Sequence, residues 1–152
     1  MRKLSKESLY LLNLSNQNHI KLLEEFEKEN SLSLRGNLDN DNPNEIDEIV
    51  FLEKDNSIKT LCQIHGERDI KTCNLTLFNT SSMNSTSKLL KYVTNYALEL
   101  LGMEKTVLHL SNKDMNMKSI LIENDFEDLG EENGITIFLK EREEVLEKGI
   151  SK

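Results

Sequence analysis

The sequence predicts an α/β protein with a mixed, mostly antiparallel sheet that is flanked by helices and contains a central βαβ crossover. Three strand-like segments follow one another across short turns, which is typical of an antiparallel meander. A long amphipathic helix then leads to another strand, as a crossover between parallel strands requires. The 152 residues, 37% of them hydrophobic, suit one core. We therefore expect a single domain over 1–145 and a charged tail over 146–152.

The first elements are a strand and a helix. A short apolar run over Ser8–Ser15 predicts an opening strand. Ser15 or Asn16 can cap a helix that extends to Asn30, because its apolar residues recur at helical spacing. The polar stretch Asn37–Glu48 contains the only proline and predicts a loop.

The predicted meander consists of Ile46–Lys54, Ser57–His65 and Asp69–Asn79. The turn-forming pairs Asp55-Asn56 and Gly66-Glu67 separate these segments. The order of strands and short turns predicts antiparallel pairing between neighbours.

The strongest helix prediction covers Ser87–Leu101. Leu90, Val93 and Ala97 fall on one face, which we expect to pack on the sheet. Gly102 can end this helix, because glycine readily adopts the left-handed conformation found there.

The last elements are a strand over Thr106–Leu110, a short helix over Asn116–Asn124 and a strand over Gly134–Lys140. The predicted order is β, α, loop, three β, α, β, α, β. We expect Thr106–Leu110 to lie parallel to Asp69–Asn79, because a helix of the right length connects them.

Charge and hydropathy exclude several classes of function. The chain has 19 basic and 27 acidic residues, a formal net charge of −8, and the acids are spread throughout. A phosphate-binding surface for nucleic acid is therefore not expected. No run of 18 uncharged apolar residues predicts a membrane span.

The cysteines and the acidic loop do not suggest a metal or a disulfide framework. Cys62 and Cys73 lack the paired spacing of a zinc site, and buried thiols are favoured over a redox pair. Without a signal-type cleavage pattern, this indicates a cytoplasmic protein. The stretch that begins at Asp39 resembles a calcium loop, but Pro43 and Val50 stand where ligands are needed, so no metal is expected.

The segment NMKSILIENDF, residues 116–126, is similar to a shortened N-x-x-[AS]-I-x-L-Y-E-K-x-G-F motif. Asn116 and Ser119 fit the first half, whereas alignment on Phe126 places Asp114 and Met117 there instead. A helix, a glycine and a strand over Tyr96–Ser111 precede this segment. In this motif and this order of elements, the chain from Asp69 to Glu141 resembles the GNAT superfamily of acyl-CoA-dependent N-acetyltransferases. The resemblance implies a GNAT-like fold.

The resemblance implies acetyl-CoA, or another acyl-CoA, as co-substrate, and direct transfer of the acetyl group to a primary amine. The resemblance implies that the strand backbone around Leu77–Asn79 holds the pantetheine, the loop Ser82–Ser87 the pyrophosphate, and Asn116 the cofactor arm. The implied cofactor-binding residues are Leu77, Phe78, Asn79, Ser82, Asn84, Ser85, Thr86, Ser87, Asn116 and Ser119.

The sequence departs from the family at two places. Asn84 and Thr86 replace the glycines of the pyrophosphate loop, and their side chains are expected to occupy phosphate space. Glu123 or Leu121, depending on the register, replaces the tyrosine that often protonates the thiolate. A catalytically inactive GNAT-fold binding or regulatory module is therefore the alternative function. A structural subunit whose sheet edge pairs with another copy is the third.

The candidates for proton transfer are weak ones. Glu45, Asp47 and Glu48 could hold or deprotonate a cationic amine, although a solvated acidic loop is the favoured interpretation. His65 and His109 could act as bases, but surface or packing roles are favoured for both. We expect a small-molecule or peptide amine, cationic in charge, as acceptor. A homodimer is the expected form if the chain assembles.

Overall fold

The computed structural model describes residues 6–34, 42–80, 82–111 and 116–142. These residues form a seven-stranded sheet with the order β1-β2-β3-β4-β5-β7-β6. The strands are β1 (Ser8–Leu11), β2 (Glu45–Lys54), β3 (Ser57–Glu67), β4 (Thr72–Phe78), β5 (Lys105–Ser111), β6 (Glu127–Glu132) and β7 (Ile135–Glu141). The helices are α1 (Gln17–Asn30), α2 (Met83–Asn95) and α3 (Asn116–Glu123), and a π-helical turn, η2 (Tyr96–Leu100), extends α2.

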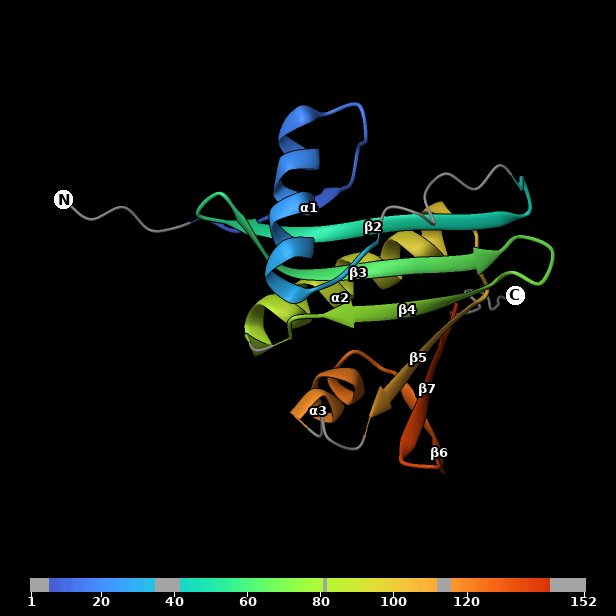
Figure 1. Ribbon diagram of the computed structural model, residues 1–152. Coiled ribbons are helices and arrows are strands. Elements are labelled where there is room, and N and C mark those ends of the chain that lie inside the picture. Colours follow the sequence, from blue (N-terminus) through green and yellow to red (C-terminus); the bar gives the residue numbers. More distant parts are fainter. Residues whose placement is uncertain (1–5, 35–41, 81, 112–115, 143–152) are drawn as a thin grey trace, which may run out of the picture.

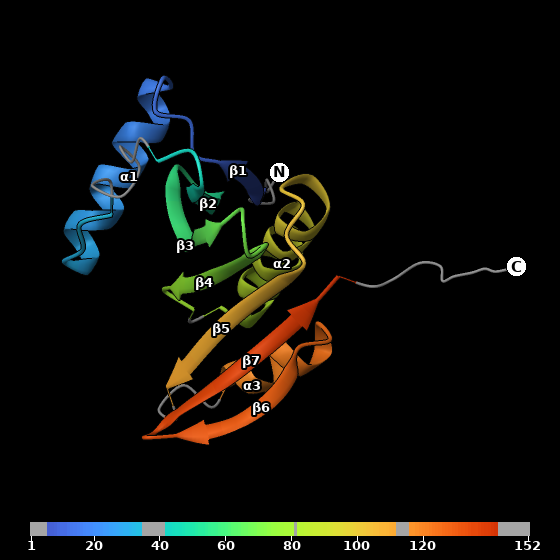
Figure 2. The ribbon, with the colours of Figure 1, turned by 90° about the vertical axis from the view of Figure 1, so that its right-hand side faces the viewer.

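The sheet separates two layers of helices (Figure 2). Helix α1 covers what we call the α1 face, where Phe26 packs with Phe51 and Leu61 in one cluster. Helices α2 and α3 cover the opposite face, the α2 face, around a larger cluster that includes Leu90 and Phe138. Alternation along each strand therefore decides which helix layer a side chain meets.

The predicted parallel pair is confirmed, and α2 connects its strands. β4 pairs with β5 in parallel from Thr72 opposite Lys105 to Leu75 opposite Leu108. Beyond this point the ladder stops, and β5 and β7 diverge from β4 (Figure 1). The fold thus contains a V-shaped opening between its two central parallel strands.

Helix α2 packs as predicted but begins four residues before the expected start at Ser87. Leu90, Val93 and Ala97 are fully buried against the sheet, which confirms the predicted face. Ser82 is the N-cap, because its Oγ accepts a hydrogen bond of 3.3 Å from the amide of Ser85. The expected loop over Ser82–Ser87 is therefore wrong, since Met83 to Ser87 lie in the helix.

Strand β6 was not predicted. All six of its residues, EDLGEE, are exposed, so the sequence carries no apolar alternation there. The strand exists because it pairs with β7 at the edge of the sheet. Charged side chains on an edge strand disfavour its pairing with strands of other chains.

Several predicted strand ends are also wrong. The first strand ends at Leu11 and not at Ser15, and β2 begins at Glu45, inside the predicted loop. β4 begins at Thr72 and ends at Phe78, because Lys71 and Asn79 adopt left-handed backbone conformations with φ of 52° and 60°. The predicted tail over 146–152 and residues 37–41 of the predicted Asn37–Glu48 loop lie outside the described residues.

Both cysteines are buried and unpaired, as expected. In the part of the chain that the structure describes, no helix has the length and apolar character needed to cross a membrane.

Candidate functional site

The opening between β4 and β5 contains a cleft of about 210 Å³. It is lined by residues of both strands, of α3 and of the segment after β4. These residues are Asn74, Leu75, Thr76, Leu77, Thr80, Leu108, His109, Leu110 and Met117. Within the described residues, the backbone of β4 has no strand partner on this side from Thr76 to Phe78. The cleft therefore offers unpaired main-chain donors and acceptors to an extended ligand.

The chemistry of the cleft is mostly neutral. Leucine and methionine side chains provide apolar walls, and Thr76 and Thr80 add hydroxyl groups. His109 is the one titratable side chain among the lining residues. This combination suits a long, uncharged chain with amide groups, and it places one proton donor or acceptor beside that chain.

The N-terminus of α2 stands near the open end of the V, beside the end of β4 (Figure 1). The first bond within the helix runs from the amide of Thr86 to the Ser82 carbonyl, and the amide of Ser85 is taken by the Ser82 side chain. The preceding amides, of Met83 and Asn84, have no acceptor within the helix. They and the helix dipole favour an anion at this end of the cleft.

The residues expected along the pantetheine lie in different places. Leu77 lines the cleft. Phe78, by contrast, packs against the cluster under α1. Asn79 follows the strand with a left-handed backbone, where the chain turns toward α2.

The residues expected around the pyrophosphate also differ in their exposure and contacts. Asn84 is exposed in the first turn of α2, whereas Ser85 and Thr86 are buried. The Thr86 hydroxyl donates to the Ser82 carbonyl at 2.7 Å, inside the helix. Thr86 therefore does not fill phosphate space, because its side chain faces the core. Ser87 is half-buried and accepts a hydrogen bond of 3.4 Å from the Asn124 side chain.

Helix α3 lines the cleft through Met117, which the alignment on Phe126 places in the motif but which was not among the expected cofactor-binding residues. Asn116 is the first residue of α3, but its side chain lies outside the described residues, and Ser119 is exposed. Met117 instead lines the cleft. Thr76, Thr80 and Met117 were missed as site residues, and only the divergence of the strands identifies them.

The three acids expected to act together do not share a face. Glu45 and Asp47 point to the α1 face, in line with Ile49 of the α1 cluster. Glu48 points to the α2 face, where its carboxylate accepts a hydrogen bond of 2.5 Å from the Tyr96 hydroxyl. The predicted grouping of Glu48 with its neighbours is wrong, because strand residues alternate between faces.

On the α1 face, Asp47 forms a close contact with His65. The distance from Asp47 Oδ1 to His65 Nδ1 is 2.6 Å, and the side chains are 7% and 48% exposed, respectively. The hydrogen bond to Asp47, with the nearby charges of Glu45 and Glu67, raises the pKa of His65, against a smaller opposing effect of burial. His65 was favoured as a surface residue, and its carboxylate partner was not predicted.

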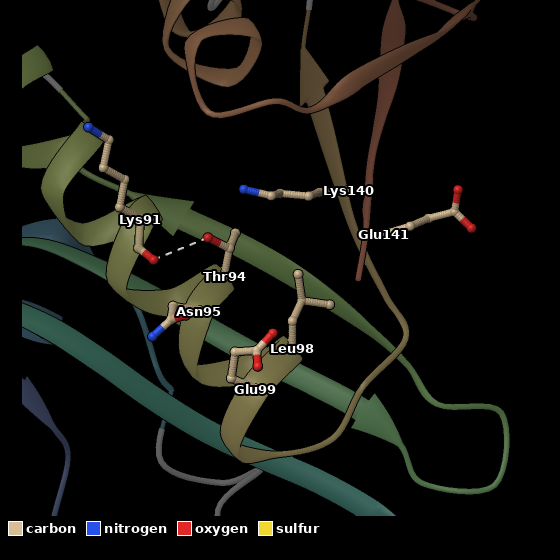
Figure 3. Close-up of a pocket in the computed structure, with 7 residues that line it drawn as sticks. All are labelled: Lys91, Thr94, Asn95, Leu98, Glu99, Lys140 and Glu141. Atoms are coloured by element: carbon tan, nitrogen blue, oxygen red, sulfur yellow. Dashed lines mark hydrogen bonds between the residues drawn. The ribbon is translucent and has the colours of Figure 1, made fainter. Parts of the chain in front are cut away.

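A second cavity of about 310 Å³ lies between the C-terminal part of α2 and the end of β7 (Figure 3). Lys140 extends toward α2, whereas Glu141 points away from it. The polar groups here include Thr94, which donates to the carbonyl of Lys91 at 3.2 Å. This cavity involves none of the residues that the resemblance identifies, so the cleft between β4 and β5 is the candidate site.

No protein-family model matches the sequence, and no curated protein matches it significantly. Solved structures do match. The N-acetyltransferase PseH of Campylobacter jejuni in complex with acetyl coenzyme A has a TM-score of 0.65 and 14% identity, over 91% of this chain and 100% of that chain. A probable acetyltransferase from Staphylococcus epidermidis has a TM-score of 0.65 and 17% identity, over 90% of this chain and 99% of that chain.

A third match is the dodecameric spermidine N-acetyltransferase of Vibrio cholerae. It has a TM-score of 0.62 and 13% identity, over 89% of this chain and 93% of that chain. At these identities the comparisons establish a shared fold.

Proposed function

Because the chain has the GNAT fold, we propose that it is an acyl-CoA-dependent N-acetyltransferase that moves an acetyl group from acetyl-CoA to a primary amine by direct transfer. The observation that carries this proposal is the cleft between β4 and β5, with the N-terminus of α2 at its open end.

The cleft fits the thioester arm of acetyl-CoA. The unpaired stretch from Thr76 to Phe78 spans two residue steps, about 7 Å of extended chain. Its free backbone groups would bind the amides of the pantetheine, as an added strand would. Leu77 and Met117 would pack against the alkyl parts.

The amides of Met83 and Asn84 would bind the pyrophosphate at the start of α2. No lysine or arginine belongs to this first turn, and the nearby Lys88 contacts Glu7 at 2.6 Å. Backbone amides would therefore have to supply most of the attraction, so we expect weaker binding than in a protein with a glycine loop. Ser82, Asn84 and Ser119 remain proposed contacts of the cofactor.

His109 is the proposed proton donor to the leaving thiolate. It lines the cleft from β5, and the replacements for the family's tyrosine do not serve this role. Leu121 has no titratable group, and Glu123 is an exposed acid on α3. An imidazole in this position can donate a proton to the sulfur through a ring nitrogen.

The acceptor amine would approach over the α1 face, where Glu45 and Asp47 lie on β2 and Glu67 on β3. Three carboxylates on adjacent strands favour a cationic amine. A spermidine N-acetyltransferase among the structural neighbours acts, by its name, on such an amine, and it is dodecameric. We propose a cationic acceptor and a homo-oligomer on these grounds.

A binding module without turnover is the second candidate. It is favoured by the loss of both loop glycines and of the tyrosine, which leaves a cleft with a single titratable side chain. Binding of CoA is common to both candidates, and acetyl transfer separates them.

The test measures binding first. Calorimetry with acetyl-CoA is done on the wild type, Asn84→Asp and Asn95→Asp. Both variants add one negative charge to the same helix on an exposed residue, but only Asn84 lies at the proposed pyrophosphate site. We expect Asn84→Asp to weaken binding by about tenfold, or about 1.4 kcal/mol, with a smaller effect at high salt. Equal affinities in both variants would reject this site.

Transfer is then measured by mass spectrometry of the acetylated product, with spermidine, a lysine peptide and an aminoglycoside as acceptors. Acetylation that depends on the protein supports the enzyme. Binding of acetyl-CoA with no product from any acceptor supports the module. Absence of binding contradicts both candidates.

A further inference from the structure

We propose that His65, oriented by Asp47, is the general base that takes the proton from the acceptor amine. This inference rests on the proposed acetyl transfer, and it assigns a residue to a step for which the cleft itself provides no second titratable group.

The contact between the two side chains has the geometry of an oriented base. Asp47 is nearly buried and contacts the imidazole, whereas about half of the His65 side chain is exposed. Since the carboxylate accepts from Nδ1–H, the neutral imidazole keeps its lone pair on Nε2. A buried carboxylate that fixes the tautomer of an exposed imidazole is the arrangement that makes histidine an effective base.

The pair lies in register with the closed end of the cleft. Asp47 is opposite His65 across β2 and β3, and His65 is opposite Asn74 across β3 and β4. Asn74 lines the cleft, and the parallel ladder ends one residue later at Leu75. Directly paired residues are about 5 Å apart at Cα and point to the same face. His65 is therefore one strand away from the point at which the thioester would lie.

The imidazole is accessible on this face. Helix α1 packs over the half of β3 that contains Ile58 and Leu61. His65 lies toward the other end of the strand and is exposed. His109 is on the same face of β5, since its neighbours Leu108 and Leu110 belong to the cluster on the α2 face. A base and an acid would thus flank the cleft from β3 and β5.

The surrounding charges favour this use. The titratable groups that face His65 are Asp47 and Glu45 on β2 and Glu67 on β3, and all three raise its pKa. On β4 the paired residue is Asn74, which does not titrate. The carboxylates would stabilise the imidazolium that forms, and they would attract the ammonium form of the substrate.

The ammonium group first loses one proton to His65 Nε2, directly or through one water molecule, and the imidazolium passes this proton to water. The amine lone pair then forms the C–N bond at the thioester carbonyl, and the attacking nitrogen becomes positively charged. This nitrogen loses its second proton to His65 as the C–S bond breaks with its electron pair on sulfur. The thiolate takes a proton, for which His109 is the proposed donor. His65 finally releases the second proton to water, and His109 regains one proton from water, so the net products are the amide, the thiol and one proton.

The other histidines do not offer this arrangement. The chain has three. His19 is buried, and its Nδ1 accepts a hydrogen bond of 3.1 Å from the Asn13 amide. His109 has no carboxylate contact among the described residues. His65 alone combines a carboxylate partner with an exposed ring.

The test compares His65→Gln, Asp47→Asn and Glu48→Gln with the wild type, using an acceptor that the protein acetylates. We expect His65→Gln to lower kcat by 10²-fold or more, in the range of about 10²–10⁴ for general base catalysis. Its dissociation constant for acetyl-CoA should change less than twofold, which shows that the cleft is intact. Added imidazole should restore part of the rate.

Asp47→Asn serves as the test of positioning. Removing the carboxylate should shift the acidic limb of the kcat/KM profile to lower pH, because His65 loses the group that raises its pKa, and should lower the plateau about tenfold. Glu48→Gln neutralises the adjacent acid on the other face and should leave the profile unchanged.

The outcomes separate the two proposals. If the wild type acetylates amines and His65→Gln retains the wild-type kcat and pH profile, the base is another group and this inference is wrong, while the proposed function stands. If the wild type binds acetyl-CoA but acetylates nothing, the proposed function itself fails and His65 has no such role.

Discussion

The Tyr96 hydroxyl donates a hydrogen bond of 2.5 Å to Glu48 Oε1, and this contact joins the π-helical turn η2 to β2. Burial and the adjacent carboxylate raise the pKa of Tyr96, so the phenol stays protonated and remains a donor. Tyr92 stacks on Tyr96 with ring centroids 6.5 Å apart. Among the described residues, Tyr96 contacts the sheet through its hydroxyl and Tyr92 does not.

That difference predicts the effect of removing each hydroxyl. Tyr96→Phe leaves the Glu48 carboxylate without its donor and should lower the free energy of unfolding by about 1–2 kcal/mol. Tyr92→Phe should change it by less than about 0.5 kcal/mol. Urea denaturation of both variants measures this, and equal effects would mean that the bond contributes nothing.

The packing of the crossover helix predicts different losses of stability for two leucine variants. Leu90 is fully buried under α2, whereas Leu100 at the end of η2 is 75% exposed. Leu90→Asp should reduce the free energy of unfolding by several kcal/mol, because it buries an unpaired charge. Leu100→Asp should have little effect. If thermal denaturation shows that Leu90→Asp loses little stability, the packing described for this helix is contradicted.

Gly66 is required by close packing of adjacent strands. A Cβ on Gly66 would lie 2.7 Å from the Cβ of Cys73, its partner on β4. Gly66→Ala should therefore destabilise the protein by about 1–3 kcal/mol. In the double variant with Cys73→Gly the clash is absent, so the two losses should not add. Simple additivity in a denaturation cycle would show that the strands move apart instead.

His19 predicts a dependence of stability on pH. Burial lowers its pKa below the usual value near 6.5. The unfolded chain therefore binds more protons than the folded one below about pH 6.5, and the stability conferred by neutral His19 is lost as pH falls from there toward the lowered pKa. The difference in melting temperature between the wild type and His19→Gln should shrink from pH 7.5 to pH 5. A constant difference would mean that His19 does not titrate on unfolding.

The sequence predicted the elements that carry a strong apolar period. Leu90, Val93 and Ala97 identified α2 and its buried face, and the crossover rule then predicted the parallel pair. β6 could not be predicted, since all its residues are exposed and its partner β7 alone determines it. The start of α2 was misjudged because Ser85 and Thr86, polar residues typical of loops, are buried in the helix.

The candidate site was predictable only in part. Leu77 and His109 were named from the sequence, and both line the cleft. The partnership of Asp47 with His65 depends on the register of β2 against β3, which no local pattern contains. The misplaced Glu48 could have been corrected from alternation alone, because it lies one residue from Asp47.

Because both cysteines are buried, we expect the folded protein not to react with thiol reagents. Burial raises the pKa of Cys73 to about 12 and raises that of Cys62 further, so neither thiolate forms at neutral pH. A chromogenic disulfide reagent added to the native protein should then report only CoA that is set free. The same reagent in denaturant should titrate both cysteines of each chain. The same reagent thus measures the CoA released by the native protein and, separately, the thiols exposed when the protein unfolds.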